Sequence, residues 1–128
     1  MKIKTNLKLL NNVIFMLFFI LLFSCKNSTK AEDKKIEEEK MINLVSDLPL
    51  VKKHAKYLEK ATNGKRHQII LVYSNPKENN GDYWIKVGED NGTCFVSAYN
   101  FFVNPKNVKI KYLDVVSDSL IDVKNMKE

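Results

Sequence analysis

The order of apolar and polar positions divides the chain into three segments. An unbroken apolar run covers residues 13–23, charged and polar residues dominate residues 26–40, and mixed patterns occupy the C-terminal part of the chain. Apolar residues that recur every three or four positions are typical of a helix, whereas strict alternation is typical of a strand with one buried face. The mixed segment, residues 46–128, is therefore the one that we expect to form a packed domain.

One amphipathic helix is predicted over residues 48–62. Ser46 or Asp47 can supply a capping side chain, and Pro49 fits the first turn because its missing N–H would have no partner there. Gly64 is a suitable stop, since glycine tolerates the left-handed conformation that often ends a helix. Val51, Ala55, Leu58 and Thr62 recur at helical spacing.

Beyond residue 66 the pattern changes from helical spacing to alternation. The predicted strands are His67–Ser74, Tyr83–Val87, Thr93–Val103 and Val108–Leu113. Asn91-Gly92 predicts a hairpin, because both residues accept positive φ. A helix followed by four hairpin-linked strands indicates an α+β domain, with one N-terminal helix packed on a four-stranded antiparallel meander sheet. Ser119 and Asp122 have capping-box spacing, which predicts a short C-terminal helical turn.

Three of these strands contain more aromatic residues than one buried face of a sheet requires. These aromatic residues are Tyr83, Trp84, Phe95, Tyr99, Phe101, Phe102 and Tyr112. Alternation places Trp84 and Phe102 on the face opposite to Ile85 and Phe101, so we select Trp84 and Phe102 as a candidate partner-binding patch. The competing interpretation is that these rings belong to the core, covered in part by the C-terminal segment.

The N-terminal residues have the features of a secretion signal. A basic start, Met1–Lys8, precedes the apolar run Val13–Phe23, which is shorter than the roughly 20 residues of a membrane-spanning helix. Leu22-Phe23-Ser24-Cys25 resembles the lipobox of bacterial lipoproteins, although Phe23 is larger than the residue usual at its place. The resemblance implies cleavage before Cys25 and acylation of Cys25, which would anchor the chain in a membrane. An ordinary secretory signal and an uncleaved anchor are the alternatives.

A polar tether is predicted between this cysteine and the domain. Lys26–Lys40 contains one large apolar residue, Ile36, and cannot bury enough surface to fold alone, although its Glu and Lys residues favour a solvated helix. Lys26 stands where an Asp would indicate inner-membrane retention in lipoproteins, so the resemblance implies the outer membrane. The predicted organisation is a signal peptide over residues 1–24, a tether over 25–45 and a domain over 46–128.

The stretch from Leu48 to Asp114 resembles the PepSY and cystatin-like group of small α+β domains. The resemblance rests on the helix, a strand, the Glu89–Gly92 turn, and a long strand that ends in Val103-Asn104. Val103-Asn104 stands where PepSY repeats have Val-Asp, and Lys106-Asn107 replaces their Thr-Gly. Members of the group occur in envelope or extracellular proteins, and some are thought to inhibit peptidases. The resemblance implies no catalytic residue.

Composition and charge restrict the function further. The 128-residue chain has a formal charge of +6, but its basic residues do not gather in one stripe, so no nucleic-acid partner is expected. Cys25 and Cys94 are the two cysteines; with Cys25 acylated, no intrachain disulfide can form, and Cys94 is expected as a small buried residue.

No motif for catalysis or cofactor binding is present in the sequence. His54 and His67 are the two histidines, and no G-x-S-x-G, H-E-x-x-H or Cys-His signature accompanies them, so we do not expect an enzyme. Asp114, Asp118 and Asp122 are spaced by four residues, but turn and capping roles are expected for them, and neither a metal nor a cofactor is predicted.

These observations predict a lipid-anchored protein of the bacterial cell envelope whose domain binds or inhibits a partner protein. The membrane contact would be made through the lipid on Cys25, and the expected partner is another envelope protein. Two alternatives remain open at this stage: a small-ligand carrier with a cavity between helix and sheet, and a structural accessory subunit of an envelope complex.

Overall fold

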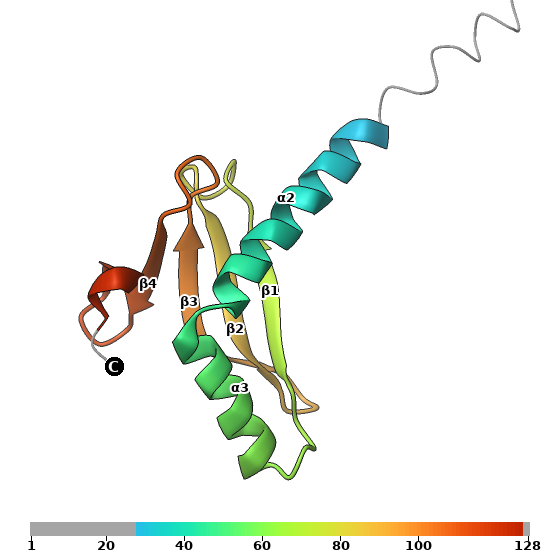
Figure 1. Cartoon of the computed structure of the whole chain (residues 1–128), viewed down its shortest axis with the longest axis vertical. Helices are drawn as coiled ribbons and strands as arrows, with labels where there is room; N and C mark the ends of the chain where they lie inside the picture. Colours follow the sequence, from blue (N-terminus) through green and yellow to red (C-terminus); the bar gives the residue numbers. More distant parts are fainter. Residues whose placement is uncertain (1–27, 127–128) are drawn as a thin grey trace, which may run out of the picture. The chain divides into compact units, whose positions relative to one another are not determined.

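The computed structural model of the protein describes residues 28–126 (Figure 1). The apolar run at residues 13–23 and the predicted acylation site Cys25 lie outside these residues. Residues 36–126 belong to one compact unit.

The described residues form an α+β fold of two helices followed by an antiparallel sheet. The elements are α2 (Ser28–Ser46), α3 (Pro49–Ala61), β1 (Gln68–Ser74), β2 (Tyr83–Asp90), β3 (Phe95–Val103), β4 (Ile110–Asp114), β5 (Ser119–Asp122) and a short 3-10 turn, η1 (Val123–Asn125). The strands lie in the order β1-β2-β3-β4-β5, so each one pairs with its neighbour in the chain. The predicted α+β class and meander are confirmed.

The expected number of strands and of helices is wrong. The structure has five strands, because residues 119–122 form β5 and pair with β4. The helical turn predicted for this segment is limited to η1. A second helix, α2, precedes the predicted one. It includes residues 41–45, which the sequence assigned to the tether, and Met41 and Val45 are buried in the core.

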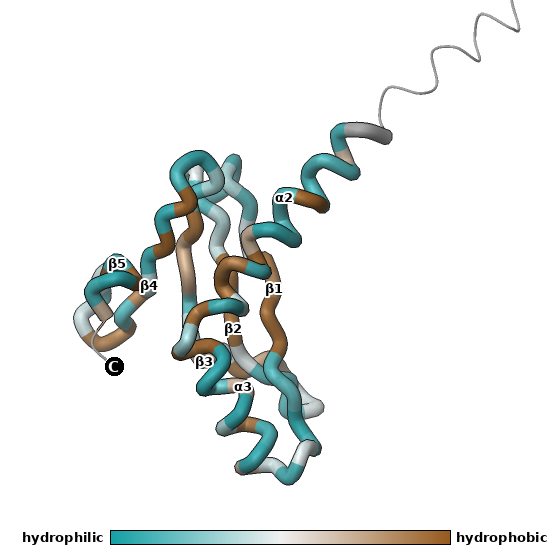
Figure 2. The backbone as a smooth tube through the Cα atoms, viewed as in Figure 1, coloured by the Kyte–Doolittle hydropathy of each residue, from teal (hydrophilic) through white to brown (hydrophobic). Residues whose placement is uncertain are grey.

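The core lies between the helices and one face of the sheet. Eight side chains in it are at most 1% exposed: Met41, Val45, Val51, Tyr83, Ile85, Val87, Phe101 and Val103. Figure 2 shows apolar residues along the strands and at the end of α2. Residues 41, 44 and 45 share one side of α2, so its last turns present an apolar stripe to the sheet. Leu48, just before α3, packs against the same core. We call this side of the sheet the helix face and the other the open face.

A β-bulge interrupts the pairing of β2 with β3. Val87 pairs with Tyr99 and Gly88 pairs with Ser97, so Ala98 is an extra residue on β3. The alternation predicted for Thr93–Val103 is therefore broken at Ala98. A side chain at the buried Gly88 would overlap the carbonyl of Val96 and lie 2.8 Å from Cζ of Phe95, so this position requires glycine.

Candidate partner-binding surface

The open face of the sheet carries a row of aromatic side chains. Trp84 and Phe102 are directly paired across β2 and β3, and their rings are stacked with centroids 5.4 Å apart. Tyr73 on β1 meets Trp84 edge to face at 4.6 Å. Ring pairs at these distances contribute roughly 0.5–1.5 kcal/mol beyond the area that they bury. We call Tyr73, Trp84 and Phe102 the aromatic row.

The predicted patch residues are brought together, and the row extends beyond them. Trp84 and Phe102 are both half-buried, and Tyr73 is 57% exposed. Tyr73 could not be assigned to this face from the sequence, because β1 has apolar residues on both faces and therefore no clear alternation. The pairing of Ser74 with Trp84, after an irregularity next to Tyr73, brings the Tyr73 ring beside the indole.

Polar and charged side chains hold Tyr73 and Trp84 in the row. The ammonium of Lys86 lies 3.5 Å from the ring centroid of Tyr73 and 4.9 Å from that of Trp84, within cation–π range. The indole N–H of Trp84 donates a hydrogen bond to Asn100 at 3.1 Å. The row is therefore held in place before any partner arrives, which lowers the entropy cost of binding.

A second polar cluster lies beside Phe102, around the carboxylate of Asp82. Asn104 donates its side-chain N–H to Asp82 at 2.8 Å, and the Lys111 ammonium lies 3.4 Å from the other carboxylate oxygen. Lys111 pairs with Phe102 across β3 and β4. Half-buried rings rimmed by satisfied polar groups are the usual anatomy of a protein contact surface.

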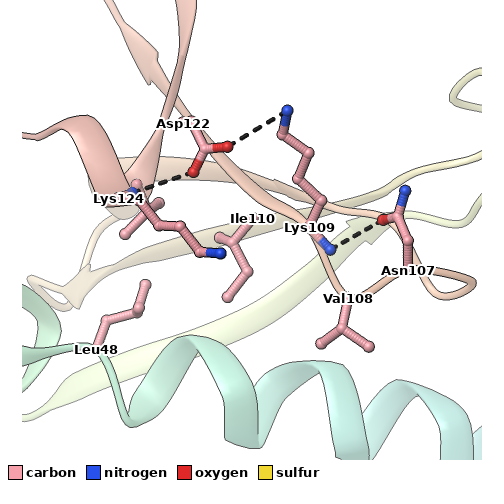
Figure 3. Close-up of a pocket in the computed structure, with 8 residues that line it drawn as sticks. Leu48, Asn107, Val108, Lys109, Ile110, Asp122 and Lys124 are labelled. Atoms are coloured by element: carbon pink, nitrogen blue, oxygen red, sulfur yellow. Dashed lines mark hydrogen bonds and ion pairs between the residues drawn. The ribbon is translucent and has the colours of Figure 1, made fainter.

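Two hollows lie away from the open face. The first, of about 510 Å³, is shown in Figure 3 and is lined by Leu48, Asn107, Val108, Lys109, Ile110, Asp122, Val123 and Lys124. Asp122 accepts a hydrogen bond from the Lys124 N–H at 3.1 Å and forms an ion pair with Lys109 at 3.3 Å. The second, of about 420 Å³, lies between α3 and Tyr99.

Val108, on the rim of the first hollow, has φ of +58°. This conformation is costly for a β-branched residue. It is supported here by the turn that Asn104 organises, because the Asn104 carbonyl accepts the Val108 N–H at 2.9 Å. The strained backbone of Val108 is therefore held by a hydrogen bond within the hairpin between β3 and β4.

The remaining residues considered for chemistry have structural contacts. Cys94 is exposed, so its expected burial is wrong; the hairpin places it beyond the last pair of β2 and β3. His54 is hydrogen-bonded to Gln68 at 2.9 Å, and His67 is exposed before β1. Asp114 accepts hydrogen bonds from the Ser117 hydroxyl and the Val116 N–H, which lower the pKa of Asp114.

Within residues 28–126, no group of three or more His, Cys, Asp and Glu side chains is placed to hold a metal ion. None of the helices in this part of the chain has both the length and the apolar character that a membrane span requires.

Comparisons of the chain with protein-family models, curated proteins and solved structures find no significant match.

Proposed function

We propose that the chain is a membrane-anchored lipoprotein of the bacterial cell envelope whose domain binds, and in doing so can inhibit, a partner protein through the open face. The observation that carries the proposal is the aromatic row, because Tyr73, Trp84 and Phe102 form one preorganised cluster on a face that no described helix covers. Exposed aromatic clusters with a polar rim are characteristic of interfaces rather than of solvated surfaces.

The charge beside the aromatic row indicates what kind of partner surface would fit it. Lys86 lies against the row and has no ion pair within the described residues, so the open face offers aromatic rings beside a positive charge. We expect a folded envelope protein with an apolar contact surrounded by acidic groups, since complementary charge steers association and fixes orientation. The resemblance to PepSY and cystatin-like domains is part of this proposal, as is the outer-membrane location.

A ligand carrier is less well supported. Such a carrier was expected to keep a cavity between helix and sheet; eight core side chains pack between the helices and the sheet, and the hollow of about 420 Å³ between α3 and Tyr99 has the exposed Tyr57 at its rim. The hollow in Figure 3 is at the surface, beside β4 and η1, and would be the place to look for a small ligand. A purely structural accessory subunit would use the same open face, and differs in forming a permanent complex.

The open face can be tested by photo-crosslinking in the organism that makes the protein. A photoreactive phenylalanine analogue at position 73 should give one discrete adduct, and Trp84→Ala should abolish the adduct while the chain still unfolds cooperatively. Val116 is 93% exposed in the turn before β5 and provides the control position, where no adduct is expected. Equal adducts at both positions, no adduct at 73, or loss of folding in Trp84→Ala would contradict the proposal.

The anchor is tested separately. Cys25→Ala should leave the protein unacylated and block cleavage of the signal, so that mass spectrometry finds a longer chain without lipid. If the variant matures and partitions into detergent as the original chain does, the lipoprotein proposal is wrong.

A further inference from the structure

The middle strand β3 has an unpaired edge over its first half. The three residue pairs between β3 and β4 are Phe101–Tyr112, Phe102–Lys111 and Val103–Ile110. The next residues of β4, Leu113 and Asp114, pair with β5 instead, and Figure 1 shows β4 turning away from β3. Among the described residues, positions 95–100 of β3 therefore have a strand on one side only. Such an edge presents N–H and C=O groups to which another extended chain can bond.

The hollow between α3 and β3 lies beside this free edge. It is lined by Leu50, Lys53, His54, Tyr57 and Tyr99, and its volume of about 420 Å³ lies in the range of sites that hold organic ligands. The side chain of Tyr99 points to the helix face, where its ring meets His54 edge to face at 5.5 Å. A chain that paired with β3 near Tyr99 would direct every second side chain to the helix face, and the side chain beside Tyr99 toward this hollow.

The walls of the hollow are held in place by contacts outside it. His54 is hydrogen-bonded to Gln68 of β1, and Tyr99 contacts the rings of Phe101 and Tyr112. Tyr57, by contrast, is 69% exposed, so its ring has little other packing to account for its position. A site with fixed walls and one exposed aromatic residue at the rim suits the insertion of a bulky apolar side chain.

Charge indicates the rest of the ligand. Lys53 lines the hollow, and Lys56 and Lys60 follow it at helical spacing along α3 as exposed residues. None of the three forms an ion pair within the described part of the chain, whereas the neighbouring Lys52 is paired with Asp47 at 2.9 Å. Free ammonium groups along α3, one of them in the wall of the hollow, favour acidic residues in a bound chain.

We propose that the free edge of β3 and the adjoining α3 hollow form a peptide-binding site. The ligand is an extended peptide that adds to β3 as a strand, inserts one aromatic or large aliphatic side chain between Leu50, Tyr57 and Tyr99, and places acidic residues near Lys53. This site lies on the helix face and is independent of the aromatic row. It gives the domain a second mode of binding, one that recognises an unfolded or extended segment.

The experiment is a selection of random twelve-residue peptides displayed on phage against the whole protein. Enriched peptides should combine acidic residues with one aromatic or large aliphatic residue. A labelled copy of the most enriched peptide is then titrated by fluorescence anisotropy. Tyr57→Ala should weaken binding at least about tenfold, as expected for an aromatic anchor, and Lys53→Glu should weaken it and reduce its salt dependence.

Matched controls exist on the open face, because Tyr73 is also an exposed tyrosine and Lys86 is also free of ion pairs among the described residues. Tyr73→Ala and Lys86→Glu should leave peptide affinity unchanged. Hydrogen exchange should show that the peptide slows exchange of amides within residues 95–100. The proposal is overturned if no peptide is enriched, if Tyr57→Ala binds as tightly as the original chain, or if these amides exchange at the same rate with and without peptide.

Discussion

The phenol of Tyr83 donates a hydrogen bond of 2.6 Å to the carboxylate of Glu37, which joins the first residue of β2 to α2. Tyr83 is fully buried, and burial together with the negative charge of Glu37 raises the pKa of the Tyr83 phenol far above its ordinary value. The contact ties the charged part of α2 to the core.

This contact predicts a loss of stability at alkaline pH. The unfolded chain releases the Tyr83 proton near pH 10, whereas the folded chain retains it to higher pH. The unfolded state then binds fewer protons, so the free energy of unfolding is unaffected below pH 10 and falls as pH rises above it. Tyr83→Phe should cost about 1 kcal/mol at pH 8 but lose less stability between pH 8 and pH 11, as measured by urea unfolding. If the difference in free energy of unfolding between the two chains were the same at pH 8 and pH 11, the raised pKa of Tyr83 would be contradicted.

Truncating Met41 should destabilise the domain as a core substitution does. Its side chain is 1% exposed in the last turns of α2, and removing a buried Met side chain costs about 2–5 kcal/mol. Ile36 on the same helix is 60% exposed, so Ile36→Ala should change the free energy of unfolding by less than about 0.5 kcal/mol. If Met41→Ala changed the free energy of unfolding as little as Ile36→Ala does, the end of α2 would not belong to the folded unit.

The sequence contains the apolar spacing by which α2 contributes to the core, but the charged residues before it led us to place the domain boundary too late. Met41, Leu44, Val45 and Leu48 have helical spacing, yet they follow residues 26–40, where charged residues dominate. A boundary drawn from average polarity falls too late when a helix is solvated over its first turns and buried over its last. Helix α3 was predicted closely because its apolar stripe is uninterrupted and Pro49 marks its start.

The strand β5 lacked a local signal. The turn before it contains no glycine, and Asp118 adopts the positive φ of 48° that glycine or asparagine usually marks in a hairpin. Its four residues are also too short for alternation to be recognised. The residues of the aromatic row could likewise be predicted only in part. Alternation selects Trp84 and Phe102, but the position of Tyr73 depends on the irregularity in β1.

The bulge at Gly88 should make this glycine the least replaceable in the described chain. An alanine methyl group would overlap the carbonyl of Val96, and backbone on both strands would have to move. We expect Gly88→Ala to cost more than about 3 kcal/mol, within the large effects seen for overpacked cores. Gly81 has positive φ but open space around it, so Gly81→Ala should cost only about 1–2 kcal/mol. Thermal or urea unfolding of both variants measures the difference.

Asn104 makes one contact that an aspartate at the same position could not make. Its side-chain oxygen accepts the N–H groups of Lys106 and Asn107, which an aspartate could also do, but its N–H donates to Asp82. Asn104→Asp would put two carboxylates in contact and raise the pKa of both. We expect a loss of about 1–3 kcal/mol at pH 7 that becomes smaller as pH falls, measured by unfolding at pH 4 and pH 7. A loss independent of pH would exclude the carboxylate pair.

Because each strand pairs with the strand next to it in the chain, the sheet can form as a succession of hairpins without a long crossover. The contacts that span the greatest length are those between helix and sheet, as between Glu37 and Tyr83, which are 46 residues apart. Closing such loops is slower than forming hairpins, and local topology favours rapid folding. A domain with this topology can therefore assemble its sheet from an extended chain one hairpin at a time, and the contacts of α2 with the sheet complete the core last.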